Sequence, residues 1–332
     1  MRRSRISGTG HYVPSQVVPN SELEKIMDTS DAWIQERTGI KERRYFVEGE
    51  DTTSNMGTKA AQMALKNAGL EASQIDMIIF ATLSPDYVFP GSGVLVQRQL
   101  GVKNIPALDV RNQCTGFIYA LSVADQFIKT GMYNHVLVIG SEIHSSGLDF
   151  SDNGRAVSVI FGDGAGAAVL SPSEDDDSGI LSTHLHADGE FAEELAAKDP
   201  GSNVKPRLTK EMIDEGTIYP YMNGSLVFKN AVVRFPEVIM EALAANNLAT
   251  TDLDMLIPHQ ANLRITQFVQ QKMGLAAEKV YSNIERYGNT TAASVPIALS
   301  EAMQEGRIKK GDLVCLAAFG SGFTWGSALI RW

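Results

Sequence analysis

The sequence predicts an α/β fold built from two duplicated halves, and two observations lead to this fold class. Short apolar runs alternate with stretches of helical character along the 332 residues, which is typical of layered α/β proteins. In addition, residues 64–79 (ALKNAGLEASQIDMII) align without gaps with residues 242–257 (ALAANNLATTDLDMLI), and FGDGAGAAVL (161–170) resembles FGSGFTWGSALI (319–330). Because both repeats occur in the same order, we expect two halves with buried parallel strands, packed about a pseudo-twofold axis with a cleft at their junction.

The elements of the first half follow from caps, apolar runs and glycines. An N-cap region at Asp51–Ser54 begins a helix that continues to Asn67 and stops at Gly69. The remaining pattern predicts strands at 77–82, 107–110 and 135–140, helices at 91–100 and 116–130, and a turn at 162–164 that is flanked by 156–161 and 167–170.

The second half repeats this succession of elements. Its pattern predicts helices at 226–243, 262–273 and 292–303, and strands at 255–258, 312–318 and 326–330. We place the boundary between the halves so that residues 1–174 form the first and residues 175–332 the second. The polar segment 175–221 is expected to be a long surface excursion or cap.

Composition excludes several classes of function. The formal net charge is −10 and the pI about 5.1, so non-specific binding of nucleic acid is not expected. Two cysteines argue against a disulfide-stapled secreted fold. We find neither a signal peptide nor an apolar run of about 18 residues, so we expect no membrane association and a cytoplasmic location.

Cys114 is the first candidate for chemistry. It lies in RNQCTGF (111–117), between a predicted strand and a predicted helix. At a helix N-terminus, free N–H groups and the helix dipole favour an anion, so we expect the thiolate to be accessible as a nucleophile for an acyl carbonyl. The alternative, a buried structural thiol, is the interpretation we adopt for Cys315, which lies in the middle of the strand VCLAAF.

His259 and Asn289 are further candidates. His259 directly follows a predicted strand, and open α/β sheets bind ligands at the carboxyl ends of their strands. A satisfied structural histidine is the alternative there, and Asn289, in YGNTT, is equally compatible with an ordinary turn. The other five histidines lie in loops or at strand starts and are expected to be surface or structural residues: His11, His135, His144, His184 and His186.

Two other kinds of site are not predicted. The glycine-rich GDGAG (162–166) and FGSGFTWG (319–326) match neither GxGxxG nor the Walker pattern, so they do not indicate a nucleotide site. Histidines and cysteines lack the paired spacings of metal ligands.

Six blocks of this sequence together resemble β-ketoacyl-acyl-carrier-protein synthase III. They occur in order over essentially the whole chain, and they are TSDAWIQERTGI (29–40), CTGF (114–117), FGDGAGAAVL, PHQANLRI (258–265), YGNTTAASVP (287–296) and FGSGFTWGSAL. The resemblance implies a thiolase-like, five-layered αβαβα fold, a homodimer, and the condensing reaction that initiates fatty-acid synthesis without a cofactor.

The resemblance also implies roles for individual residues. Cys114 takes an acyl group from acyl-coenzyme A, malonyl-acyl carrier protein then loses carbon dioxide, and its carbanion attacks the acyl-enzyme. His259 and Asn289 would donate hydrogen bonds to the malonyl thioester oxygen, and the backbone N–H groups of Cys114 and Ser321 would hold the oxyanion.

Binding residues follow from the same resemblance. Coenzyme A would contact Trp33 and Arg155 through its adenine and Arg37 through a phosphate, and its pantetheine would pass Met222, Gly224, Phe228, Ala261 and Asn262. The acidic carrier protein would dock on Gln260, Arg264, Lys229 and Lys272. Phe89 would reach across the homodimer to close the partner's acyl pocket.

Several stretches depart from the family pattern and leave the acyl group open. RNQC replaces a run of small residues before the thiol, TLSPDYVFPG differs near the dimer contact, and FGSG replaces FGGG. A specialised paralogue that condenses a medium-chain or aromatic starter for a secondary metabolite is therefore an alternative. A carrier-binding scaffold of the same fold and a cysteine hydrolase are further alternatives.

Overall fold

The structure is a computed structural model that describes residues 2–173 and 177–332. The predicted boundary between residues 174 and 175 lies outside the described residues. None of the described helices has the length and apolar character needed to span a bilayer.

The first sheet has five strands in the order β1-β7-β6-β4-β5. Their bounds are β1 Ser4–Tyr12, β4 Met77–Ala81, β5 Ala107–Val110, β6 Val136–Glu142 and β7 Gly164–Pro172. β4 runs parallel to β5 and β6, whereas β7 runs antiparallel to β1 and β6. The strands β4 and β6 are buried along their whole length, which is expected where helices cover both faces of a sheet.

The second sheet repeats four of these strands. Its order is β11-β12-β13-β8, with bounds β8 Gly179–Ala187, β11 Met255–Pro258, β12 Leu313–Gly320 and β13 Thr324–Arg331. β11 is parallel to β12, and β13 is antiparallel to β12 and β8. The succession β8-β13-β12-β11 therefore has the same order and directions as β1-β7-β6-β4, which agrees with the predicted duplication.

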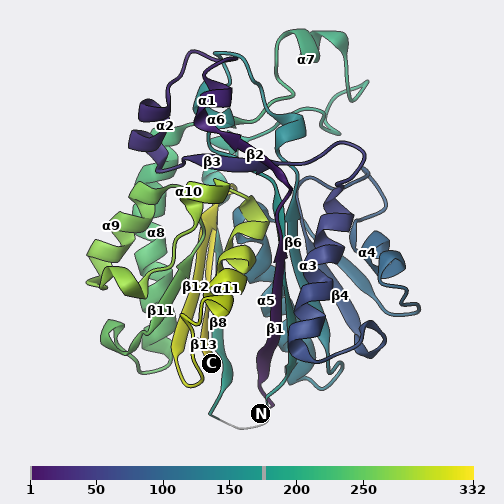
Figure 1. Cartoon of the computed structure of the whole chain (residues 1–332), viewed down its shortest axis with the longest axis vertical. Coiled ribbons are helices and arrows are strands. Elements are labelled where there is room, and N and C mark those ends of the chain that lie inside the picture. Colours follow the sequence, from purple (N-terminus) through teal and green to yellow (C-terminus); the bar gives the residue numbers. More distant parts are fainter. Residues whose placement is uncertain (1, 174–176) are drawn as a thin grey trace.

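Helices complete the five layers (Figure 1). The central layer consists of α5 (Gly116–Lys129) and α11 (Ser294–Gln304), which contact both sheets. On the outer side of the first sheet lie α3 (Thr53–Ala68) and α4 (Gly93–Gln99), and on the outer side of the second lie α8 (Gly224–Ala245) and α9 (Leu263–Met273). This is the αβαβα arrangement that the family resemblance implies.

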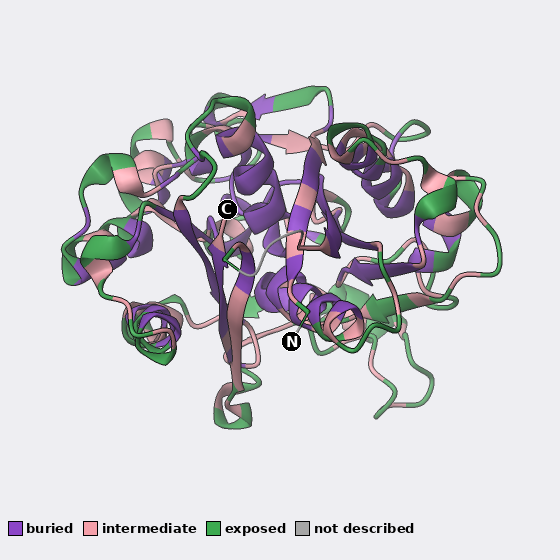
Figure 2. Ribbon diagram, turned by 90° about the horizontal axis from the view of Figure 1, so that it is seen from below, coloured by how far each residue is buried: buried purple, intermediate pink, exposed green. Residues whose placement is uncertain are grey.

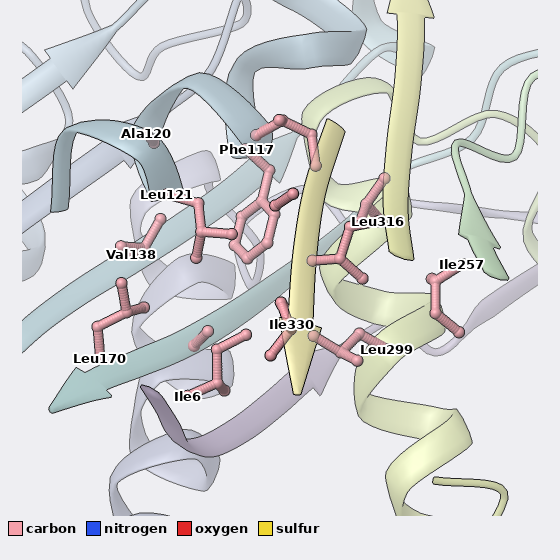
Figure 3. Close-up of a cluster of buried hydrophobic side chains, with 14 of the residues drawn as sticks. Ile6, Phe117, Ala120, Leu121, Val138, Leu170, Ile257, Leu299, Leu316 and Ile330 are labelled. Atoms are coloured by element: carbon pink, nitrogen blue, oxygen red, sulfur yellow. The ribbon is translucent and has the colours of Figure 1, made fainter. Parts of the chain in front are cut away.

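The largest hydrophobic cluster lies between the two sheets (Figure 3). Phe117 and Leu121 of α5 and Leu299 of α11 pack there against Val138 of the first sheet and Leu316 of the second. Figure 2 shows the buried residues gathered on these inner elements and the exposed ones at the periphery. This core holds the amino-terminal ends of α5 and α11, and with them the candidate site.

The internal repeat occupies equivalent places in the two halves. Residues 64–79 form the end of α3, the 3₁₀ turn η1 and β4, and residues 242–257 form the end of α8, the turn η5 and β11. Asp76 accepts the N–H of His135 at the start of β6, and Asp254 accepts the N–H of Leu313 at the start of β12. Each aspartate thus ties its strand to the neighbouring parallel strand.

Strand β1 was not predicted from the sequence. Its glycines are required by close packing on α3, because a Cβ on Gly8 would lie 2.3 Å from the carbonyl oxygen of Ala64 and one on Gly10 2.3 Å from that of Ala60. Gly, Ser and Thr replace the apolar alternation that normally marks a strand.

The prediction that 175–221 is a surface excursion is wrong for its first part. Residues 179–187 form β8, a strand of the second sheet whose Ile180 is fully buried. The rest of the segment carries short elements only, and these are η4 Gly189–Phe191, β9 Leu195–Ala196, α7 Lys210–Asp214 and β10 Tyr221–Met222.

The remaining elements are short. Several gather at the upper end of the molecule in Figure 1, namely β2 Gln16–Pro19, α1 Asn20–Leu23, α2 Asp31–Thr38, β3 Glu42–Tyr45, α6 Arg155–Ser158 and α10 Ile284–Tyr287. The 3₁₀ turns are η1 Ala72–Gln74, η2 Gln113–Thr115, η3 Ser145–Gly147, η5 Thr250–Asp252, η6 Ala277–Lys279 and η7 Thr291–Ala293.

Candidate active site

Cys114 lies where the sequence predicts, between strand β5 and helix α5. It is the middle residue of the 3₁₀ turn η2, and α5 begins two residues later at Gly116. Only 6% of the residue is exposed. The preceding residue, Gln113, has φ = +36°, a conformation that residues other than glycine rarely adopt.

Groups from the other half of the chain surround the sulfur. The backbone N–H of Ser321 and the hydroxyl of Thr291 lie near enough to the Cys114 thiol to act on its pKa. Gly320 permits this approach, because a Cβ at this position would lie 2.5 Å from the Cys114 Cβ and 2.8 Å from its Sγ. The predicted oxyanion-hole residue Ser321 is therefore next to the nucleophile.

Burial decides the protonation state of the thiol. It raises the pKa of Cys114 to about 12, and the buried carboxyl of Glu142 acts in the same direction. Hydrogen bonds from Ser321, from Thr291 and from the cysteine's own N–H lower the pKa only in part. The expectation that the helix N-terminus would favour the thiolate is thus not met, because loss of solvent outweighs it.

His259 lies directly after β11 and is held on both sides. Its N–H donates to the carbonyl of Ala317, and its Nδ1 lies 3.0 Å from Oγ of Ser294. That hydroxyl already accepts the N–H of Gln260, so its own proton is available for Nδ1. When this hydroxyl donates to Nδ1, the imidazole proton lies on Nε2.

The Nε2 atom of His259 is buried and has no hydrogen-bond partner within residues 2–173 and 177–332. Burial lowers the pKa of His259 to about 3, so the ring is neutral at physiological pH. A neutral ring with its proton on Nε2 is an unpaired donor, which suits a substrate oxygen.

Asn289 is fixed in a comparable way. Its N–H donates to the carbonyl of Ile160, and its Oδ1 accepts the N–H of Thr291. Because the oxygen is used within the chain, the Nδ2 group is the end left for a ligand, and Nδ2 makes no hydrogen bond among the described residues.

Thr291 links these groups, and the sequence analysis missed it. Its hydroxyl lies 2.7 Å from Nε2 of His144 and also acts to lower the pKa of the Cys114 thiol. Burial lowers the pKa of His144 to about 4, so this ring is neutral as well. Thr291 has φ = +49°, which is a strained conformation for a β-branched residue and marks a constrained site.

A cavity of about 870 Å³ opens beside the thiol. Its wall includes Cys114, Thr291, Ser321 and His144, together with Leu195 and Ile218 from the segment after β8. His259 and Asn289 do not line this cavity. Residues 289–294 link these two residues to the cavity. Within this segment, Asn289 accepts the N–H of Thr291, which lines the cavity together with Cys114, and Ser294 bonds His259.

The predicted adenine site contains the expected side chains in a closed arrangement. The guanidinium carbons of Arg37 and Arg155 lie 4.8 and 5.2 Å from the centre of the Trp33 ring. A base stacked between indole and guanidinium needs about 7 Å, or two contacts of about 3.5 Å. Arg155, which also pairs with Asp28, must therefore move before a base can enter.

The predicted pantetheine residues border α8 and α9. Met222 ends β10, Gly224 begins α8, and Phe228 lies one turn further along α8. Ala261 precedes Asn262, which caps α9 and donates through Nδ2 to the carbonyl of Arg37. This bond joins the start of α9 to α2.

The three basic residues that are predicted to bind the carrier protein are exposed, whereas the fourth predicted contact, Gln260, is buried. Lys229, Arg264 and Lys272 lie on the surface of the adjacent helices α8 and α9. Gln260 is only 1% exposed, and its amide bonds Pro258, Tyr281, Ser282 and Asn283. Its side chain is therefore unavailable to a partner, and we correct that assignment.

Phe89 points away from the cavity of its own chain. It is 82% exposed and the adjacent Val88 is 80% exposed, and Tyr87 rather than Phe89 lines the cavity. Among the described residues, no group of three or more His, Cys, Asp or Glu side chains is arranged to hold a metal ion.

Comparison with known families agrees with this geometry. The family described as 3-oxoacyl-[acyl-carrier-protein (ACP)] synthase III matches residues 108–189, which contain Cys114. Its C-terminal counterpart matches residues 243–332, which contain His259, Asn289 and Ser321.

Individual relatives cover the whole chain. The β-ketoacyl-[acyl-carrier-protein] synthase III of Escherichia coli O9:H4 (strain HS) is 49% identical over 328 residues, 99% of each chain. The crystal structure of 3-oxoacyl-[acyl-carrier-protein] synthase III from Aquifex aeolicus VF5 superposes with a TM-score of 0.91 at 45% identity and covers 99% of this chain and 100% of that one. A priming β-ketosynthase from the R1128 polyketide pathway gives 0.90 at 33% identity, covering 99% and 96%. The chain belongs to the β-ketoacyl-[acyl-carrier-protein] synthase III family of condensing acyltransferases.

Proposed function

We propose that this protein transfers an acyl group from acyl-coenzyme A to Cys114 and condenses it with malonyl-acyl carrier protein, initiating fatty-acid synthesis. One observation carries the proposal. A cysteine beside a large cavity is surrounded by donors for a developing oxyanion, while two further donors, on His259 and Asn289, have no acceptor among the residues that the structure describes.

In the first step, the Cys114 sulfur bonds to the acyl carbon and the bond from that carbon to the coenzyme A sulfur breaks. The thiol proton passes to the departing thiolate, so coenzyme A leaves as a thiol. The N–H groups of Cys114 and Ser321 stabilise the oxyanion, and each such donor in a dry site lowers the barrier by roughly 3–4 kcal/mol.

In the second step, the malonyl thioester loses carbon dioxide and its α-carbon attacks the acyl-enzyme. His259 Nε2 and Asn289 Nδ2 donate to the thioester oxygen as negative charge develops there. The Cys114 thiolate leaves and takes up a proton, and the product is a β-ketoacyl group on the carrier protein. These groups complete every step, so we propose no metal or other cofactor.

The binding partners follow from surface chemistry. Trp33, Arg37 and Arg155 would hold the adenine and phosphate end of coenzyme A, with pantetheine passing between α8 and α9. The exposed Lys229, Arg264 and Lys272 would attract the acidic carrier protein, although the whole chain is acidic. We also propose a homodimer in which Phe89 enters the partner's acyl pocket, and a cytoplasmic location, since a cysteine nucleophile needs a reducing compartment.

A specialised starter is the second candidate. The cavity of about 870 Å³ is much larger than an acetyl group, and the similarity to a priming ketosynthase of a polyketide pathway supports this alternative. The two candidates share one chemistry and differ only in the acyl group on Cys114.

Mass spectrometry of the intact protein tests the proposal. Incubation with acyl-coenzymes A should add one acyl group to the wild type and to Cys315→Ala, but none to Cys114→Ala. His259→Ala and Asn289→Ala should retain acylation and lose most condensation. Normal decarboxylation of malonyl-carrier protein by Asn289→Ala would contradict its role, free acid as the main product would indicate a hydrolase, and a protein that only binds the carrier would be a scaffold.

A further inference from the structure

The wall of the cavity beside Cys114 has donors that no protein acceptor uses. Arg111 and Gln113, which flank Asn112 just before the nucleophile, both line it, and so does Tyr87. Among the described residues, none of these three side chains makes a hydrogen bond, ion pair or ring contact. A cavity that offers unpaired donors is suited to a ligand that carries acceptors.

The two carboxylates of the same wall are already occupied. Asp51 accepts the hydroxyl of Tyr12 at 2.9 Å and pairs with Lys59 at 3.1 Å. Asp86 accepts the hydroxyls of Ser54 and Ser92 at 2.8 and 2.7 Å. Neither carboxylate forms an ion pair with Arg111, so its charge remains available.

Backbone geometry brings these donors to the reacting sulfur. Arg111 follows the last residue of β5 and is three residues from Cys114, so their Cα atoms are separated by at most about 11 Å. Gln113 has the left-handed φ of +36° described above, and such strain persists only where the surroundings enforce it. An acyl group on Cys114 would extend into this space.

We infer that the acyl group taken by this protein ends in a carboxylate, and that Arg111 selects it. The substrate class is then the coenzyme A monothioester of a short dicarboxylic acid, whose distal carboxylate binds the guanidinium. Arginine suits this role because its planar fork matches a carboxylate. The transfer is the first step given above, with the distal carboxylate unchanged, so the inference rests on the proposed acyl transfer and narrows its starter.

The test compares thioesters of equal length with and without the carboxylate. Glutaryl-coenzyme A is compared with pentanoyl-coenzyme A, and adipoyl-coenzyme A with hexanoyl-coenzyme A. The rate of Cys114 acylation is followed by the mass of the intact protein. In the wild type, the dicarboxylic member should react about tenfold faster or more, since a charged hydrogen bond contributes at least that much. Arg111→Gln should abolish this preference and leave the neutral thioesters at the wild-type rate, whereas Arg111→Lys should keep part of it.

Arg98→Gln is the matched control. Arg98 is an exposed arginine on α4 that does not line the cavity, so its removal should leave the ratio unchanged. A wild type that prefers the neutral thioesters, or an Arg111→Gln variant with an unaltered ratio, would overturn the inference. So would a loss of dimerisation in Arg111→Gln at constant preference, since Arg111 would then serve a second copy of the chain. Failure of every thioester, acetyl included, would remove the proposed acyl transfer itself, a result distinct from a neutral preference.

Discussion

The hydroxyl of Ser294 lies 3.0 Å from Nδ1 of His259. The same hydroxyl accepts the N–H of Gln260, so one atom at the start of α11 orients two consecutive residues after β11. When the serine hydroxyl donates to Nδ1, the imidazole presents its own proton on Nε2. A helix from the central layer thereby determines which tautomer faces the substrate.

Ser294→Ala should lower condensation by about tenfold or more while leaving acylation of Cys114 close to normal, by analogy with residues that orient metal-binding histidines. The variant also leaves the buried N–H of Gln260 without an acceptor, which costs about 1–3 kcal/mol of stability. Product formation from malonyl-carrier protein and the mass of the acyl-enzyme separate the two steps.

Ser300→Ala provides the control for this prediction. Ser300 lies on the same helix, is fully buried, and bonds Nδ1 of His11 at 2.9 Å, so its loss removes a similar contact away from the site. An equal fall in condensation for both variants would mean that α11 stability, rather than the tautomer, explains the effect.

Gly320→Ala should abolish acylation of Cys114. The added methyl would lie 2.5 Å from the Cys114 Cβ, so either η2 or the end of β12 must shift, and the sulfur would leave the N–H of Ser321. Overpacking of this kind typically costs 1–3 kcal/mol, which circular dichroism during thermal unfolding would detect. The Gly189→Ala variant is the control. Its Cys114 should be acylated at the normal rate, because nothing lies within 4 Å of a Cβ at position 189.

Much of the fold could be predicted because local chemistry and packing agree there. Thr52 caps α3, Gly69 ends it with φ = +67°, and β5 and β11 have the predicted bounds. Strands β1 and β8 could not be predicted in this way. The glycines of β1 are imposed by contact with α3, and the polar residues of β8 reflect its position at the edge of the second sheet.

The candidate site was predictable in position but not in protonation. Cys114, His259 and Ser321 belong to sequence stretches with recognisable chemistry, whereas Thr291 and Ser294 look like ordinary residues of a turn. Their roles depend on which side chains the two halves bring together. The pKa of Cys114 could not be predicted either, since it depends on burial and on Glu142, 28 residues away in sequence.

The reactivity of Cys114 toward iodoacetamide should rise about tenfold for each pH unit between about 7 and 10. Only the thiolate reacts, and burial raises the pKa of this thiol to about 12, so the thiolate fraction increases throughout that range. Cys315→Ala is the appropriate background, because Cys114 is then the only thiol in the chain. A rate that becomes constant below pH 9 would instead indicate a thiolate stabilised at the helix N-terminus.

Glu142→Gln should change how stability depends on pH. The carboxyl is buried and accepts hydrogen bonds from Thr82, Leu83 and Ser84. Burial raises the pKa of Glu142 to about 7. Between about pH 4.5 and 7 the folded protein keeps a proton that the unfolded chain releases, so this group makes the protein less stable as pH rises.

His144 and His259 act in the opposite direction. Burial lowers their pKa values to about 4 and about 3, so they stay neutral in the folded protein while the unfolded chain binds protons below about pH 6.5. Their contribution to stability is complete above that pH and is lost as the pH falls. In Glu142→Gln the opposing contribution of the carboxyl is absent. Between pH 5 and 6.5 the free energy of unfolding of this variant should therefore rise with pH more steeply than that of the wild type. The two slopes should differ by at most about 1.4 kcal/mol per pH unit. Urea unfolding of both proteins across this range measures the slopes, and parallel curves would show that the Glu142 carboxyl is already ionised in the folded protein.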